Sequence, residues 1–260
     1  MAKGGWSKFP HADKAYVYAG AALKKNWERL HRGDCEPFPA DATLQEAWRL
    51  YHQGEFQQAC ELGLGLGHPG GAVANKAAVI YATYLEESEK KRLALFEEAA
   101  ARAEEQIAAM PKCANAHYFH ALALGRYSRG ISVAKALAQG LGNKVKESLT
   151  RAIALEPAHA DAHIALGAFH AEVIDKVGAM VGGLTYGAKK DAAVEHFDKA
   201  LKLNPDSAIA RIEYANALVM MFGQAKMAQA EKLYVDAAAC KAMDAMERLD
   251  VEVAKGELEE

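Results

Sequence analysis

Histidine is the side chain in this sequence that most invites a chemical role, and the chain has ten of them. Five fall within one stretch, at His117, His120, His159, His163 and His170. Imidazole binds zinc, copper and nickel, but a metal site needs converging ligands with hydrogen-bonding partners behind them. The sequence has neither an HExxH motif nor a paired His–carboxylate motif. We therefore expect packed or hydrogen-bonded histidines and no bound metal.

Cysteine and serine chemistry is equally unsupported. Cys35, Cys60, Cys113 and Cys240 are widely spaced and form no CxxC pair, which argues against a zinc ribbon and a redox dithiol. We expect reduced thiols. There is no GxSxG motif and no nucleophile with an adjacent base, so the sequence predicts no enzyme and no cofactor.

The segment GLGLGHPGG, residues 63–71, has the glycine content of a phosphate-binding loop. It lacks the lysine of the GxxxxGK[ST] pattern and follows a helical segment, whereas such loops follow a strand. A flexible corner between helices is the interpretation we adopt.

Composition indicates close-packed helices in a soluble protein. Hydrophobic residues make up 51%, much of it alanine, and aromatic residues 8%. The most strand-like run, AAVIYATYL (77–85), also satisfies helical spacing, so we predict a helix there. A net charge of -3 argues against nucleic acid as the partner. Neither a signal peptide nor an apolar stretch of the ~20 residues needed to span a membrane is evident, so we expect a cytoplasmic location.

Three prolines, Pro111, Pro157 and Pro205, punctuate the helical pattern in the same way. At each, an alanine-rich helix ends just before the proline, two residues follow, and a new helix begins. Proline presets φ and pushes the preceding residue out of the α region, so it favours such a corner. Asp161 falls in the first turn of the helix after Pro157, where a carboxylate is favourable.

This pattern resembles the tetratricopeptide repeat (TPR), a helix-turn-helix unit of about 34 residues with small residues where helices cross and a terminal proline. In the best unit the matching residues are Leu166, Gly167, Ala193, Phe197, Ala200 and Pro205. The preceding unit is matched by Ala121, Val145, Leu149, Ala152 and Pro157, and a weaker upstream unit by Ala47, Gly54, Phe56 and Ala59. The resemblance implies an all-α, right-handed α-solenoid.

We expect residues 1–260 to form a single TPR-like helical domain. Its parts are an N-terminal capping helix within 1–39, degenerate repeats over 40–110, the best repeats over 111–222 and C-terminal capping helices over 223–260. The proline spacings are 46 and 48 residues, which exceed the TPR length by 12 and 14. Both excesses lie between the two helices of a unit, at 125–143 and 172–190, and such inserts emerge on one face of a stack.

The two long inserts, with ALGRYS opening the first and YGAKKDAAVEHFDKALKLNP leaving the second, make residues 114–222 similar to a subgroup of TPR proteins. That subgroup includes the regulator of microtubule dynamics proteins and, more distantly, the T component of tripartite transporters. The first group acts as adaptors and tethers, and the second is thought to handle apolar ligands. This sequence shows neither the membrane anchor of the tethers nor the lipoprotein signal of the transporter component.

In TPR proteins the first helix of each unit lines a concave groove, and the resemblance places its lining on twelve residues here. They are Asn115, Tyr118, Leu122, Arg126, Asp161, Ile164, Ala168, Glu172, Ile209, Ile212, Asn216 and Met220. A mixed apolar and polar lining suits a peptide or helix laid in the groove. The first functional hypothesis is a non-enzymatic adaptor that binds another protein.

The Gly-rich second insert supports another hypothesis, a carrier of a small apolar ligand held between this insert and the groove. Met180, Leu184 and Tyr186 would then line the ligand site. Alternatively, the inserts are buried protein that fills the groove. The sequence leaves these alternatives open.

Overall fold

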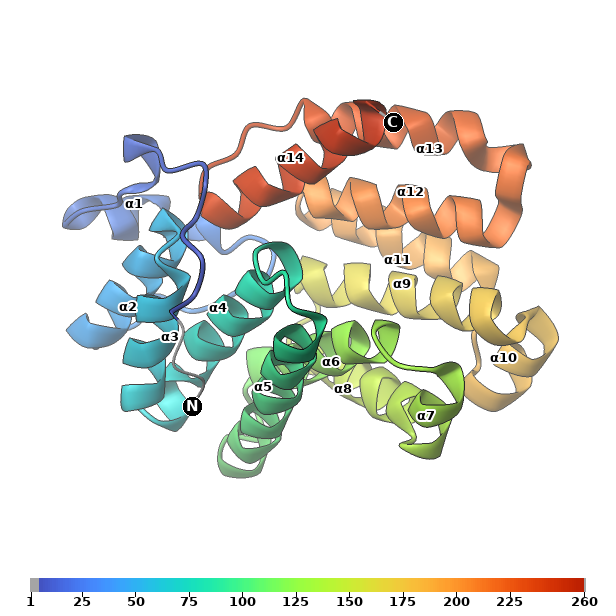
Figure 1. The fold of residues 1–260 in the computed structure, drawn as a ribbon, viewed down its shortest axis with the longest axis horizontal. Coiled ribbons are helices and arrows are strands. Elements are labelled where there is room, and N and C mark those ends of the chain that lie inside the picture. Colours follow the sequence, from blue (N-terminus) through green and yellow to red (C-terminus); the bar gives the residue numbers. More distant parts are fainter. Residues whose placement is uncertain (1–4, 260) are drawn as a thin grey trace. The chain divides into compact units, whose positions relative to one another are not determined.

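The computed structural model describes residues 5–259, and among them every regular element is a helix (Figure 1). The helices are α1 (Ala21–Leu30), α2 (Ala42–Gln53), α3 (Phe56–Gly65), α4 (Gly71–Tyr84), α5 (Glu89–Ala109), α6 (Ala114–Arg129), α7 (Val133–Ala138), α8 (Leu141–Leu155), α9 (Ala160–Val177), α10 (Ala179–Tyr186), α11 (Lys190–Leu203), α12 (Ala208–Phe222), α13 (Met227–Ala238) and α14 (Ala245–Glu259), with short 3-10 turns at Lys14–Tyr16, His68–Gly70 and Gly223–Lys226. The expectation of an all-α fold is confirmed, and most of the strand-like run 77–85 lies in α4.

The chain divides into two compact units. The first comprises residues 5–31, 36–132 and 243–246, and the second comprises 32–35, 133–242 and 247–259. Whether they act as the single domain expected from the sequence stays a prediction.

In the first unit, helices α2 to α6 pack in chain order, each against the next. The residues expected at TPR positions occupy this core. Ala47, Phe56 and Ala59 are buried, and Gly54 ends α2 in the left-handed region at φ 94°. A side chain is strained in that conformation, which explains the glycine at this turn.

The three proline corners have the geometry the sequence predicts. Helix α5 ends at Ala109 and α6 begins at Ala114, while α8 ends at Leu155 and α9 begins at Ala160. The third corner joins the end of α11 at Leu203 to the start of α12. Two residues separate each proline from the helix that follows it.

In the second unit, α9 packs against α11 and against α12, and α12 packs against α13. A close crossing joins α9 to α11, because a Cβ on Gly167 would lie 2.9 Å from Cε2 of Phe197. Phe197 is fully buried and stacks on Tyr214 of α12, with ring centroids 4.9 Å apart. The small and aromatic TPR positions therefore meet as the resemblance predicts, and they carry the core of this unit.

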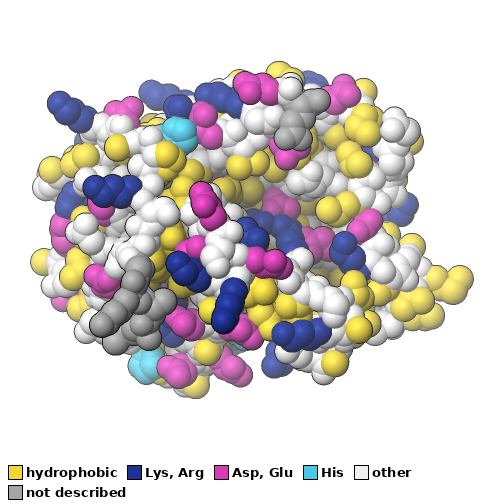
Figure 2. Space-filling view, in the orientation of Figure 1, with side chains coloured by type: hydrophobic (Ala, Val, Ile, Leu, Met, Phe, Trp, Pro, Cys, Tyr) yellow, Lys and Arg dark blue, Asp and Glu magenta, His cyan; other side chains and the backbone are white. Residues whose placement is uncertain are grey.

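Each long insert contains a short helix: α7 in the first and α10 in the second. Both belong to the second unit and lie near α8, with α7 packed against it. Figure 2 shows hydrophobic side chains projecting from the surface at the place where α10 lies in Figure 1.

The corner at residues 63–71 differs from its interpretation as a flexible connection. A Cβ on Gly70 would lie 2.1 Å from the carbonyl oxygen of Gly63, and one on Gly71 would lie 2.6 Å from the side chain of Gln106. The Gln106 amide also donates to the carbonyl of His68 at 2.9 Å. These glycines allow close packing of α3, α4 and α5, so the corner is tightly held.

Candidate functional site

The expected groove positions lie on α6, α9 and α12, the first helices of the three best repeats. Helix α6 belongs to the first unit, where Asn115 and Tyr118 are buried and Leu122 and Arg126 are partly exposed. The Asn115 amide donates to the Glu36 carboxylate, so the chain leading into α2 covers the start of α6. On this helix the accessible positions are the two nearest its C-terminal end.

The start of α9 is covered by residues 32–35, which belong to the same unit. The backbone N–H of Asp161 donates to the carbonyl of Gly33 at 2.9 Å, and Asp161 packs against Gly33 so closely that a Cβ there would lie 2.4 Å from the carboxylate. Arg32 forms an ion pair with Asp206 at 2.8 Å. A turn of this chain therefore lies over the first turn of α9.

Farther along α9, Ile164 and Ala168 are buried in the core with Phe197 and Tyr214. Glu172 is partly exposed. As on α6, the accessible groove position of α9 lies toward its C-terminal end.

On α12 the C-terminal helices cover one groove position. Ile212 is buried in a cluster with Ala237 of α13 and with Val251 and Ala254 of α14, and Ile209 packs against the same cluster. Asn216 is partly exposed and accepts a hydrogen bond from Tyr234 of α13 at 2.7 Å.

Met220, near the end of α12, is 42% exposed. Its neighbour Val219 is 37% exposed. The chain's own segments thus occupy the early groove positions of each first helix, and the late positions stay accessible.

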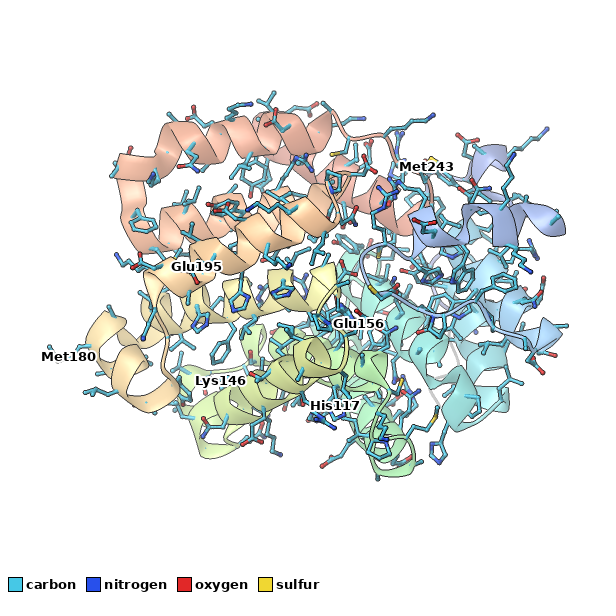
Figure 3. All side chains as sticks on the ribbon, turned by 180° about the vertical axis from the view of Figure 1, so that it is seen from behind. His117, Lys146, Glu156, Met180, Glu195 and Met243 are labelled. Carbon is cyan, nitrogen blue, oxygen red and sulfur yellow. The ribbon has the colours of Figure 1, made fainter. Side chains whose placement is uncertain are left out.

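The expected ligand-lining residues of α10 fall on different sides of that helix. Met180 and Leu184 are 79% and 85% exposed, and Figure 3 shows Met180 on the outer side of α10. Tyr186 is partly buried, with its ring edge-on to Phe169 at 6.4 Å. Its carbonyl accepts from Lys146 Nζ at 2.7 Å. Only Tyr186 of the three faces the protein.

Two of the histidines expected at equivalent repeat positions make equivalent contacts. Nε2 of His117 lies 3.1 Å from the carbonyl oxygen of Pro111, and Nε2 of His163 lies 3.4 Å from that of Pro157. Arg211 takes this place at the third corner and donates to the carbonyl of Pro205 at 2.8 Å. These side chains therefore act as structural donors at the corners.

His163, His170 and His196 form a cluster between α9 and α11. The Nδ1 atoms of His163 and His196 lie 2.9 Å apart, and the His170 ring stacks on His196 with centroids 5.9 Å apart. Since Nε2 of His163 donates to Pro157, its Nδ1 is the acceptor in the neutral ring, and His196 Nδ1 carries the proton between them.

All three of these rings favour the neutral form. Burial, followed by the neighbouring His163 and His170, lowers the pKa of His196 to about 4. Burial is also the main reason that the pKa values of His163 and His170 are lowered. Neutral imidazole is a metal ligand, but no three His, Cys, Asp or Glu side chains converge as metal ligands within residues 5–259.

A buried polar network in the first unit has no signal in the sequence. Nδ1 of His52 lies 2.7 Å from Asp244, and Nε2 of His52 lies 3.2 Å from Nε2 of His31. Tyr18 donates to the carbonyl of Met243 at 2.5 Å. The network fastens residues 243–246 to helices near the N-terminus, 192 positions away along the chain. No repeat pattern or local motif could have paired these residues.

The four cysteines are free thiols, and Cys35 and Cys60 are poor nucleophiles. Burial, with smaller contributions from Glu156, Asp34 and Asp161, raises the pKa of Cys35 to about 12. Burial likewise raises the pKa of Cys60 to about 11. The reactive form of a cysteine is the thiolate, which these surroundings disfavour.

The arrangement of helical hairpins defines the class of protein. A solved structure of a thermophilic TPR protein from Thermus thermophilus is similar to this chain, with a TM-score of 0.57 and 17% identity, covering 82% of this chain and 97% of the other. The fold is thus a TPR-like right-handed α-solenoid.

The sequence pattern of the family described as "Regulator of microtubule dynamics protein 1-3" matches residues 43–255. The chain belongs to this family, as its long inserts suggested. No curated protein matches the sequence significantly. Within residues 5–259, no helix is long and apolar enough to cross a membrane.

Proposed function

We propose that this protein is a non-enzymatic scaffold that binds a peptide or a partner's helix along the groove positions of its repeats. The observation that carries the proposal is that the chain already places its own segments there. Residues 32–35 lie on Asp161 through main-chain contact, and α14 packs its apolar face near Ile212. The lining therefore accommodates both a main-chain contact and the apolar face of a helix, and a helix laid in a groove is a common mode of peptide recognition.

The proposed binding surface consists of the groove positions of the second unit that remain accessible. On the packed pair α9 and α12, these are Glu172, Asn216 and Met220, with Val219 beside them. The first unit has accessible groove positions of its own, Leu122 and Arg126 on α6. A partner segment with apolar side chains toward Met220 and a basic side chain toward Glu172 fits the second unit.

The side-chain chemistry favours binding over catalysis. The raised pKa values of Cys35 and Cys60 keep both thiols protonated. The neutral histidine cluster bonds to a main-chain carbonyl and to itself, so it is engaged in structural contacts. We accordingly propose another protein as the partner, in the cytoplasm, with neither cofactor nor nucleic acid. The exposure of Met180 and Leu184 gives no support to the alternative, a carrier with an enclosed apolar site.

Site-specific photocrosslinking tests this proposal. A photoreactive amino acid at Met220 should crosslink a protein partner from cell extract, and the same group at exposed Lys202 on α11 serves as the control. A partner identified by mass spectrometry is then purified and rebound to the wild type. The double variant Glu172→Lys, Met220→Lys should weaken that binding at least tenfold, with Lys202→Glu unchanged. Equal crosslinking at both positions, or unchanged binding by the double variant, would contradict the proposed surface.

A further inference from the structure

Helix α10 turns a glycine toward the protein and large apolar side chains toward its surface. Gly182 is buried, and a Cβ on it would lie 3.0 Å from a methyl carbon of Val173. The large side chains point the other way, with Met180 79%, Val181 52% and Leu184 85% exposed. Burying such side chains is the usual driving force of folding, so a helix that turns glycine inward and methionine and leucine outward is built to contact something else.

The α10 helix is firmly held by its inner face. Tyr186 packs against α8 so closely that a Cβ on Gly142 would lie 2.8 Å from the Tyr186 ring. Lys146 of α8 bonds to the Tyr186 carbonyl, and Ala188, just beyond α10, is buried in the core of the unit. The exposed side chains are consequently presented on an anchored element.

Helix α7 lies at the same end of the second unit as α10, because both contact α8. Its Val133 and Leu137 are 43% and 50% exposed. We define the insert tip as Val133, Leu137, Met180, Val181 and Leu184.

The charges around the insert tip are mainly positive. Residues 133–146, which include α7, contain three Lys residues and no Asp or Glu. Lys135 and Lys144 are exposed on this side, and Lys176 and Lys189 flank α10 and are also exposed. The acidic groups nearby are Asp175, which lies 3.5 Å from Lys176, the exposed Glu147 and Asp191, and the partly exposed Glu172.

From this combination we propose that the insert tip docks on the surface of an anionic lipid bilayer. The apolar side chains enter the boundary between headgroups and acyl chains, and the lysines contact the lipid phosphates and carboxylates. Each lysine near an anionic bilayer and each buried apolar group adds to the affinity, so neither set needs to be large. The basic surroundings favour this partner over a second copy of this chain, whose own tip would carry the same positive charges.

Vesicle flotation with the full-length protein tests the proposal. We expect the wild type to float with phosphatidylcholine vesicles that contain phosphatidylserine, and to float poorly with phosphatidylcholine alone or in high salt, because salt screens the lysines. The variant Met180→Asp, Leu184→Asp should lose at least tenfold in binding, and Lys144→Glu, Lys189→Glu should lose about tenfold. All four substituted positions are exposed, so their folding is checked simply by melting temperature.

The matched controls lie on other helices of the same unit. Val235→Asp changes an apolar side chain on α13 that is 54% exposed, and Lys202→Glu reverses a charge on α11. Both should bind vesicles as the wild type does. Absence of wild-type flotation with anionic vesicles would overturn the proposal, and so would equal flotation of Met180→Asp, Leu184→Asp. Sedimentation velocity showing a dimer that this variant abolishes, without vesicle binding, would assign the tip to a second copy. None of these outcomes depends on the groove proposed above.

Discussion

Nε2 of His117 lies 3.1 Å from the carbonyl oxygen of Pro111, six residues earlier, so a hydrogen bond joins the first turn of α6 to the proline corner before it. Proline ends α5, but its own carbonyl is not paired within that helix. We expect His117→Phe to lower the free energy of unfolding by about 1 kcal/mol, the usual net value of such a hydrogen bond. His117→Gln, which can place a donor near the same point, should recover part of the loss.

Chemical denaturation measures this difference. His68→Phe is the control, since His68 is exposed. An equal loss in His117→Phe and His117→Gln would mean that ring packing matters at this corner and the hydrogen bond does not.

The close crossing of α9 and α11 predicts a strong size limit at Gly167. A Cβ there would already lie 2.9 Å from the buried ring of Phe197. Gly167→Leu should therefore destabilise by ~1 to 3 kcal/mol, as overpacking of a core does. The exposed Lys189→Leu should leave the melting temperature nearly unchanged. Equal melting temperatures for the two variants would refute the crossing.

These corners and crossings are the part of the fold that the sequence predicts well. Pro157 fixes its own φ and keeps the preceding residue out of the helical backbone conformation. Gly167 and Phe197 match a repeat whose spacing can be read from the sequence. Residues 32–35 on Asp161 and Asp244 on His52 could not be predicted, because each pair meets only after distant segments pack. The accessibility of the groove positions could not be predicted either, because it depends on those returning segments.

The outward direction of the Met180 and Leu184 side chains could not be predicted from the sequence either. A short run of apolar residues and glycines shows no clear periodicity, so it does not indicate which face is buried. Only the structure shows which face of α10 is buried, because Gly182 packs against Val173 there.

The histidine cluster predicts a loss of stability in acid. His196 has its pKa lowered to about 4 from an ordinary value near 6.5, so between these values the unfolded state binds more protons than the folded state. Stability is fully present above pH 6.5 and falls as the pH is lowered toward 4.

His196→Asn tests this pH dependence, since an Asn amide can donate near the position of Nδ1 but does not titrate. We expect the variant to lose less melting temperature than the wild type between pH 7 and pH 5. His11→Asn is the control, because His11 makes no contact with this cluster and lies in the other unit. A wild type and His196→Asn with parallel melting profiles would show that other groups control the acid response.

Asp244 should be the residue on which the attachment of segment 243–246 depends most. Its carboxylate is buried and pairs with Nδ1 of His52, which is itself fully buried, so Asp244→Ala leaves an imidazole nitrogen without its partner. Loss of a buried hydrogen bond to a charged group costs about 2 kcal/mol. Asp236→Ala, on the exposed face of α13, should cost less than about 0.5 kcal/mol. Urea unfolding compares the two, and hydrogen exchange of the amides of residues 243–246 should accelerate only in Asp244→Ala. Unchanged exchange there would mean that the Tyr18 contact to Met243 suffices to hold the segment.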